Sequence, residues 1–264
     1  MKPAPFEYRA PTSVDEALPL LGLDSAVLAG GQSLVPLLNL RLARPEVVVD
    51  INGIDELAYI STDGGTLRLG ALTRQSAIER SELVSDGWPL LHKAVRLVGH
   101  PQIRARGTVG GSVAHADPAA ELPVALTVLD ARYRLRSAGG ERVVGSAEFF
   151  RGPLETAREP DELLVEIEVP ALPEGAGSGF AEHARTHGDF ATAGAAALVA
   201  PGRAAVALLG AGPAPVRAEA AERALADGAE PREAAALAAQ EVEDEHRRAL
   251  CSELARRAIE EALP

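Results

Sequence analysis

The sequence AGGQS at residues 29–33 and the sequence TVGGS at residues 108–112 share one design, a pair of adjacent glycines flanked by small hydroxyl residues. Because glycine has no Cβ, such a pair can adopt positive φ angles and bring successive backbone N–H groups close to an anion. One segment alone is more often an ordinary tight turn. Two of them in one chain fit a ligand long enough to be held at two places, and a dinucleotide with a diphosphate bridge meets that requirement.

The first segment leads into a predicted helix. Ser33 is placed to cap this helix, and Pro36 is tolerated within its first turn. Apolar positions follow at Leu34, Leu37, Leu38, Leu40 and Leu42. Gly30 and Gly31 would then lie just before a helix N-terminus, where free N–H groups and the helix dipole favour a phosphate without the help of a lysine.

Two longer stretches carry a resemblance to a known family. AGGQSLVPLLNLRLARP (residues 29–45) and GHPQIRARGTVGGSVAHADPAAELP (residues 99–123) resemble the two signature segments of the FAD-binding medium subunit of molybdenum hydroxylases, the family of carbon monoxide dehydrogenase and xanthine dehydrogenase. A weaker likeness extends from Phe6 to Arg217. The resemblance implies that FAD is bound by the residues of both segments, namely Ala29, Gly30, Gly31, Gln32, Ser33, Thr108, Val109, Gly110, Gly111 and Ser112.

Two further positions enter through the resemblance alone. Glu121 aligns with an acidic residue that touches the flavin cofactor. Leu164 aligns, by its spacing from Pro170, with a residue whose backbone meets the flavin ring, and an ordinary core leucine is the alternative. The chain departs from the family's pattern at Ala181 and Glu182, where the family often has a lysine that reaches the flavin end.

The resemblance also implies a fold and an assembly. The fold is α+β: an FAD-binding domain of the vanillyl-alcohol oxidase-like (PCMH-type) class over residues 1–172, with two subdomains that divide near residues 52–55, and a C-terminal α+β domain over residues 173–264 that looks shortened. In this family a large subunit carries molybdopterin, and a small subunit carries two [2Fe-2S] centres. Electrons pass from those centres to FAD, which reduces an external acceptor. We expect a dimer of such heterotrimers.

Two other interpretations of the residues stay open. The first is a free-standing FAD-dependent oxidase that binds its own substrate, although the chain offers no candidate base and no extra substrate domain. The second is a non-catalytic nucleotide-binding module, in which the two segments hold a ligand for structural or regulatory reasons. We predict no catalytic side chain and no metal ligand, because flavin chemistry resides in the cofactor.

Composition excludes several classes of partner. A net charge of −12 and a pI near 5.0 disfavour nucleic acid, whose phosphates would be repelled. The single cysteine, Cys251, excludes an internal disulfide and a four-cysteine iron–sulfur site on this chain. No uninterrupted apolar run reaches the roughly 18 residues of a membrane-spanning helix. We therefore expect a cytoplasmic protein.

The remaining pattern mixes short strands and helices without strict alternation, which favours an α+β fold over a doubly wound sheet. Ser13 and Glu16 form a predicted capping box. Asp117 is predicted to cap a helix that runs to about residue 129. Strands are predicted at residues 26–28, 47–51, 57–60, 66–69, 131–135, 163–169, 193–199 and 204–209. Further helices are predicted at residues 14–21, from residue 73, at residues 88–98 and near the C-terminus. The last of these places Leu250, Leu254, Ala258 and Ala262 on one apolar stripe.

Three other motifs carry alternatives. Gly210-Ala211-Gly212 follows a strand, but prolines come next where a Rossmann helix is required, so that interpretation is rejected. His183 and His187 have a metal-ligand spacing without a third ligand, and a surface pair is favoured. Cys251 has arginines nearby that could lower its pKa, although a partly buried structural cysteine is commoner.

Overall fold

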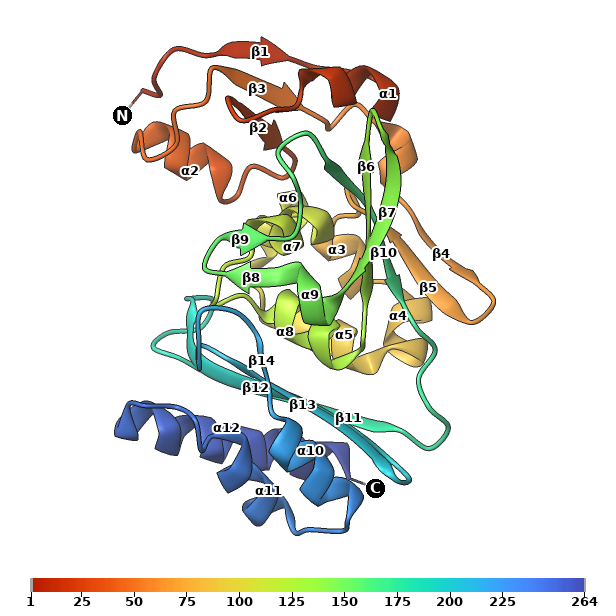
Figure 1. Cartoon of the computed structure of the whole chain (residues 1–264), viewed down its shortest axis with the longest axis vertical. Coiled ribbons are helices and arrows are strands. Elements are labelled where there is room, and N and C mark those ends of the chain that lie inside the picture. Colours follow the sequence, from red (N-terminus) through yellow and green to blue (C-terminus); the bar gives the residue numbers. More distant parts are fainter. Residues whose placement is uncertain (1, 264) are drawn as a thin grey trace.

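A computed structural model of the chain describes residues 2–263 and shows three parts stacked along its longest axis (Figure 1). The N-terminal part contains a small sheet, the middle part a larger sheet with most of the helices, and the C-terminal part a third sheet covered by helices. The prediction of an α+β chain is confirmed. Among residues 2–263, no helix combines the length and the apolar content that crossing a bilayer requires.

The N-terminal sheet is parallel, in the order β1-β3-β2. Its middle strand is the β-branched run predicted at residues 47–51, and Val48 and Val49 are buried. Because β2 ends at Leu28, the first glycine segment begins at the carboxyl edge of this sheet. The elements of this part are β1 (Glu7–Arg9), α1 (Val14–Ala17), the 3-10 helix η1 (Leu18–Leu20), β2 (Ser25–Leu28), α2 (Leu34–Asn39), β3 (Val47–Asp50) and the 3-10 helix η2 (Asp55–Leu57).

The middle sheet is antiparallel, in the order β4-β5-β10-β6-β7. The strand predicted at residues 163–169 is its central strand β10, and every residue of it is buried, including Glu166 and Glu168. The elements of this part are β4 (Ile60–Asp63), β5 (Thr66–Gly70), α3 (Gln75–Glu79), α4 (Glu82–Gly87), α5 (Pro89–Leu97), α6 (Pro101–Arg106), α7 (Val109–His115), α8 (Glu121–Val128), β6 (Arg132–Ser137), β7 (Gly140–Gly145), α9 (Ser146–Phe149), β8 (Phe150–Gly152), β9 (Glu155–Thr156) and β10 (Leu163–Val169).

The C-terminal sheet is buried on both faces. One face packs against the last three helices, and the other contributes Phe180, Leu198 and Leu209 to the core of the middle part. A Cβ on Gly179 would lie 2.0 Å from the carbonyl oxygen of Ala258, so glycine allows the last helix to approach the sheet. The elements are β11 (Gly177–Ala184), β12 (Ala191–Ala200), β13 (Arg203–Leu209), β14 (Val216–Arg217), α10 (Glu219–Ala226), α11 (Pro231–Ala238) and α12 (Glu245–Ala262).

Several predicted element ends are wrong. The strand predicted at residues 57–60 runs over 60–63, because Leu57 is held in η2. The helix predicted from Thr73 begins at Gln75. The helix predicted at 14–21 divides into α1 and η1; Ser13 caps it as predicted, but the Glu16 carboxylate accepts from Thr12 instead of closing the capping box.

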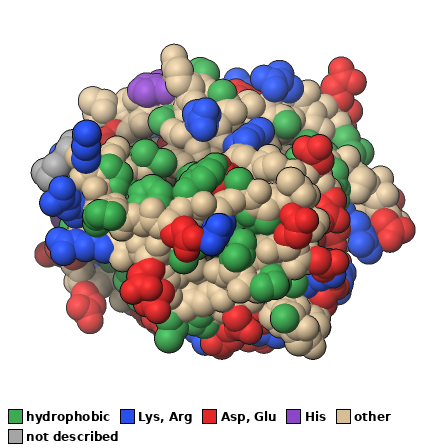
Figure 2. Space-filling model, turned by 90° about the horizontal axis from the view of Figure 1, so that it is seen from above, with side chains coloured by type: hydrophobic (Ala, Val, Ile, Leu, Met, Phe, Trp, Pro, Cys, Tyr) green, Lys and Arg blue, Asp and Glu red, His purple; other side chains and the backbone are tan. Residues whose placement is uncertain are grey.

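The helix after the first glycine segment is shorter than its apolar pattern. It ends at Asn39, so Leu40 and Leu42 lie beyond it and are 59% and 74% exposed. Only Leu38 of this helix is buried. Figure 2 shows the molecule from above relative to Figure 1, that is, from the end at which the N-terminal sheet lies. On the face seen there, hydrophobic side chains lie among acidic and basic ones. Leu40 and Leu42 are therefore surface residues and not part of a core.

Candidate functional site

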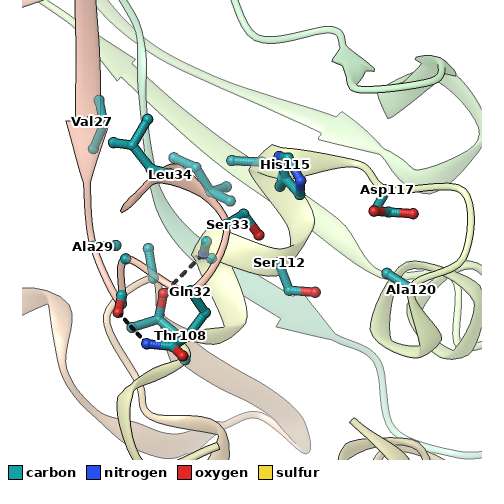
Figure 3. Close-up of a pocket in the computed structure, with 18 of the residues that line it drawn as sticks. Val27, Ala29, Gln32, Ser33, Leu34, Thr108, Ser112, His115, Asp117 and Ala120 are labelled. Carbon is teal, nitrogen blue, oxygen red and sulfur yellow. Dashed lines mark hydrogen bonds between the residues drawn. The ribbon is translucent and has the colours of Figure 1, made fainter. Parts of the chain in front are cut away.

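A cleft of about 580 Å³ lies where the three parts of the chain meet. This volume is in the range of small-molecule and cofactor sites. Residues of both glycine segments line it, and Figure 3 shows Gln32 and Ser33 on one wall with Thr108 and Ser112 on the other. Leu34 and Leu37 of α2 add apolar surface, and Gly188, Asp189 and Phe190 from the loop between β11 and β12 complete the lining.

The first glycine segment is a loop with unused donors. Gly31 has a φ of +73°, as predicted, and a Cβ on Gly30 would lie 2.4 Å from the carbonyl oxygen of Arg106. The backbone N–H groups of Gly30, Gly31, Gln32 and Ser33 donate to no acceptor within residues 2–263. The prediction that Ser33 caps α2 is wrong: its backbone is helical and its side chain makes no capping bond, so the hydroxyl is left at the cleft.

The second glycine segment is the first turn of helix α7, which the sequence analysis missed. Thr108 caps this helix through its Oγ1, which accepts from the N–H of Gly111 at 3.0 Å. The N–H of Val109 donates to Thr73 O and that of Gly110 donates to Ala71 O, both at 3.0 Å. The N–H groups of Val109, Gly110, Gly111 and Ser112 are therefore used within the protein.

The glycines of the second segment serve close packing. Neither Gly110 nor Gly111 has a positive φ, so that expectation is wrong for this segment. A Cβ on Gly110 would lie 2.6 Å from both the Cβ and the carbonyl oxygen of Ala71. Val109 is fully buried and lies outside the cleft lining, whereas the Thr108 and Ser112 side chains reach it.

Glu121 lies at the cleft in an unusual state. It is the first residue of α8, is 7% exposed, and accepts no hydrogen bond from another of the described side chains or backbone groups. Burial raises the pKa of Glu121 to about 8; a hydrogen bond from its own backbone N–H opposes this shift, and the charges of Glu182 and Asp117 add to it. At neutral pH this carboxyl is mostly protonated, so it can donate a hydrogen bond into the cleft.

Two buried polar atoms near this region have no partner in the described structure. Gln75 is 4% exposed and lines the cleft, and its Oε1 makes no hydrogen bond. Glu182 has an unpartnered Oε2, and burial raises its pKa to about 7. Sequence reasoning missed Gln75, because nothing in the local pattern marks it as different from a surface glutamine at a helix start.

The cleft holds more acidic than basic side chains. Arg158 is the one arginine or lysine among its lining residues in the part of the chain described, and its guanidinium donates to the carbonyl oxygens of Glu159 and Glu162. Four acidic residues are among the lining residues, namely Asp117, Glu121, Glu162 and Asp189, and the carboxylate of Glu162 already accepts from Arg142. A bound anion would therefore depend on backbone N–H groups.

The other predicted positions have separate outcomes. Leu164 lines the cleft and also belongs to the main hydrophobic core, so it is a core leucine with a surface at the site. Asp117 lies at the cleft but does not cap α8, which begins after Ala120. Its carboxylate accepts from the N–H of Ala119 at 2.8 Å.

The cysteine and the histidine pair lie outside the cleft lining. Cys251 is buried, and burial raises the pKa of its thiol, which supports the interpretation of a structural cysteine. His183 and His187 belong to no cluster of metal-ligand type among residues 2–263.

Comparisons with known proteins agree on one family. A family model described as the FAD binding domain in molybdopterin dehydrogenase matches residues 4–172. The chain is 45% identical over 236 residues to the alpha subunit of the 6-hydroxypseudooxynicotine dehydrogenase complex of Paenarthrobacter nicotinovorans, with 86% of this chain and 80% of that protein covered. It is 42% identical over 202 residues to the carbon monoxide dehydrogenase medium chain of Hydrogenophaga pseudoflava, with 75% and 70% covered.

A solved structure extends this likeness to the whole fold. The carbon monoxide dehydrogenase of Hydrogenophaga pseudoflava, in a form that lacks the Mo-pyranopterin moiety of its molybdenum cofactor, superposes with a TM-score of 0.93 and 38% identity. The match covers 99% of this chain and 98% of that chain. The resemblance and the fold class predicted from the sequence are confirmed.

Proposed function

The chain belongs to the FAD-binding family of molybdopterin dehydrogenases, and from that premise we propose that it passes electrons from [2Fe-2S] centres on a partner subunit to an external acceptor. It is an FAD-binding oxidoreductase subunit. When bound, FAD accepts electrons singly from iron–sulfur centres and releases them in pairs. The work of this chain is to bind and orient that cofactor.

The cleft fits FAD in three respects. Its volume suits a cofactor. Four consecutive backbone N–H groups of the first segment lack acceptors within residues 2–263. The buried Oε1 of Gln75 also lacks a partner. Groups without partners at a cleft of this size are what a bound polar ligand would satisfy.

The free donors of the first segment carry the assignment. We assign the FAD diphosphate to the N–H groups of Gly31, Gln32 and Ser33, together with the Ser33 hydroxyl. Ala29 and Gly30 bring this loop against the second segment, because a Cβ on Gly111 would lie 3.8 Å from the Cβ of Ala29. This arrangement needs no lysine or arginine at the diphosphate, which agrees with the acidic lining of the cleft.

The second segment contributes side chains and packing. Thr108 and Ser112 present hydroxyl groups at the cleft, while Gly110 and Gly111 let α7 lie close to its neighbours. Val109 supports the wall from the core side. We assign Thr108 and Ser112 to polar contacts with parts of the bound cofactor other than its diphosphate, and Val109 and Gly110 to the support of that wall.

Glu121 and Leu164 are assigned to the flavin end. Both line the cleft, and each is largely buried. The protonated carboxyl of Glu121 is a hydrogen-bond donor at neutral pH and can hold a polar flavin atom, whereas Leu164 supplies apolar contact and its backbone. Gln75 adds an amide that the sequence analysis did not identify.

The proposed partner subunits are inferred from the family and from the single cysteine of the chain. Medium chains and subunits of multi-subunit dehydrogenases are among the proteins that this chain resembles. Cys251 is its only cysteine, so the iron–sulfur centres must lie on another chain. We propose a large molybdopterin-binding partner and a small [2Fe-2S] partner, assembled as a dimer of heterotrimers, with residues 1–172 as the FAD-binding domain and 173–264 as the C-terminal domain.

The test combines cofactor identification with electron transfer. The purified chain should release FAD on extraction, identified by mass, and the flavin should bleach with dithionite and recover with acceptors. Co-expression with candidate partners should give a complex that survives gel filtration, since permanent interfaces bury on the order of 2,000 Å² or more. Release of FMN alone would contradict the cofactor assignment. Oxidation of a small molecule by the isolated chain with oxygen would favour a free-standing oxidase.

A further inference from the structure

A chain of polar contacts joins the two glycine segments from behind the cleft. Its first member is Asn52, which follows β3. The side-chain amide of Asn52 donates to the carbonyl oxygen of Ala29 at 2.7 Å and to Oδ1 of Asp50 at 2.6 Å. Tyr8 donates its hydroxyl to the other carboxylate oxygen of Asp50 at 2.5 Å. Asn52 is thus held in one orientation while it holds the start of the first segment.

Arg74 continues these contacts to the second segment. Its guanidinium donates to Oδ1 of Asn52 at 2.7 Å and to the carbonyl oxygen of Arg106 at 2.5 Å. The backbone of Arg74 forms a β-bridge with Thr108, the cap of α7. One arginine therefore binds both the side chain that holds Ala29 and the backbone that leads into the second segment.

The point at which the two segments touch lies beside these contacts. A Cβ on Gly30 would lie 2.4 Å from Arg106 O, the same carbonyl oxygen to which Arg74 donates. The first segment thus rests on a piece of backbone whose position Arg74 fixes. Neither Asn52 nor Arg74 lines the cleft, so these two residues act through the segments and not on a ligand.

Apolar packing already joins the N-terminal and middle parts of the chain. Leu72, Leu163 and Val165 of the middle part share one hydrophobic cluster with Val49 and Ile51 of the N-terminal part. The polar contacts are therefore not needed to hold these two parts together. What they add is a fixed register between two loops, which apolar packing specifies poorly because it has no direction.

We propose that Asn52 and Arg74 form a clamp that sets the spacing between residues 29–33 and residues 108–112, so that one FAD molecule can reach both. The clamp rests on the proposed assignment of both segments to FAD. Its two members are positioning residues. Holding the loops in the bound arrangement before FAD arrives removes an ordering cost from the binding step, which raises affinity.

The experiment measures affinities for ligands of different length. Asn52→Leu, Arg74→Met and the double variant of the full chain are freed of flavin, and the dissociation constants for FAD, FMN and AMP are measured, with AMP by competition against FAD. We expect a loss of about tenfold or more for FAD in each single variant and changes below about threefold for FMN and AMP, which need not span both segments. The double variant should lose little more than either single variant, because the two residues act as one unit.

The controls separate spacing from general damage. Arg217→Met removes a comparable arginine, which donates to Thr127 O and to the carboxylates of Asp130 and Glu222 away from the cleft, so it should lower thermal stability without changing FAD affinity. If Asn52→Leu does not fold, Asn52→Ala takes its place, since it removes the donor to Ala29 and the acceptor for Arg74 without adding a charge beside Asp50. Unchanged FAD affinity, or equal losses for FAD, FMN and AMP, would overturn the clamp. A wild-type chain that binds no FAD would overturn the proposed function itself.

Discussion

Residues 29–33 and residues 108–112 have nearly the same sequence pattern, but the first segment is a loop and the second is a turn of helix. In the first segment the glycines form a loop with a positive φ at Gly31 and four N–H groups without acceptors in the described chain. In the second, the glycines form a helical turn whose donors are bound to Ala71, Thr73 and Thr108. A glycine pair can thus serve either close approach to a ligand or close approach to another part of the protein.

The largest expected effect tests the packing role of the second segment. Gly110→Val places a side chain 2.6 Å from the backbone of Ala71, which cannot move away as a flexible side chain could. We expect a loss of about 3 kcal/mol or more in the free energy of unfolding, at the upper end of overpacking effects. Urea unfolding of the flavin-free chain measures it. Gly87→Val is the matched control, because a Cβ there meets nothing within 4 Å; equal stability of the two variants would show that Gly110 is not closely packed.

The next effect tests the ligand role of the first segment. Gly31→Val forces a β-branched residue into a positive φ at the edge of the cleft, which costs about 1–3 kcal/mol for the backbone alone. Because relaxation of that strain moves the free N–H groups, we expect FAD affinity to fall by about tenfold or more while the circular dichroism spectrum is kept. Flavin content per chain is the measurement. Full flavin occupancy would mean that the N–H groups of this loop do not hold the cofactor.

The stability of the flavin-free chain should depend on pH through Glu121, which lies on the side of the cleft formed by the second segment. The pKa of Glu121, beyond the second segment, is raised to about 8 by burial, from an ordinary value of 4.5. Since the folded state then binds the proton more tightly than the unfolded state, the stability of the flavin-free chain should fall as the pH rises between about 5 and 8. Glu121→Gln should remove its own part of this slope, roughly 1 kcal/mol per pH unit, and leave the smaller part that comes from the raised pKa of Glu182. An unchanged slope would place a charged carboxylate at this position.

The smallest effects compare the two hydroxyl residues that look like helix caps. Thr108→Val removes a capping bond to Gly111 and should cost about 1 kcal/mol of stability. Ser33→Ala removes no capping bond, so it should leave the free energy of unfolding within about 0.5 kcal/mol and weaken FAD binding by about threefold to tenfold. Thermal unfolding and flavin titration of both variants check the contrast. A destabilised Ser33→Ala would show that Ser33 is a cap after all.

The comparison also shows what the sequence could predict. Local pattern and resemblance were sufficient for the buried strand around Val48, for the strand around Ile167, for the positive φ of Gly31 and for the placement of both segments at one cleft. They were insufficient for α7, because the acceptors that fill its first donors, Ala71 and Thr73, lie on a distant piece of chain.

The other features that the sequence did not predict also depend on the tertiary structure. Ser33 matches the composition of a cap, yet its backbone enters the helical region one residue too early to accept a capping bond. Gln75 became a candidate only when the fold buried it at the cleft with an unpartnered oxygen. Asn52 and Arg74 carry no motif, and only the tertiary structure brings them together.

A crystal structure of the chain with FAD bound tests the central claim most directly. The account predicts that diphosphate oxygens lie within about 2.7–3.2 Å of at least two of the backbone nitrogens of Gly31, Gln32 and Ser33. The N–H groups of Val109 and Gly110 should still donate to Thr73 and Ala71, as they do in the present structure. A diphosphate held by the nitrogens of Val109 and Gly110, with those two bonds broken, would contradict it.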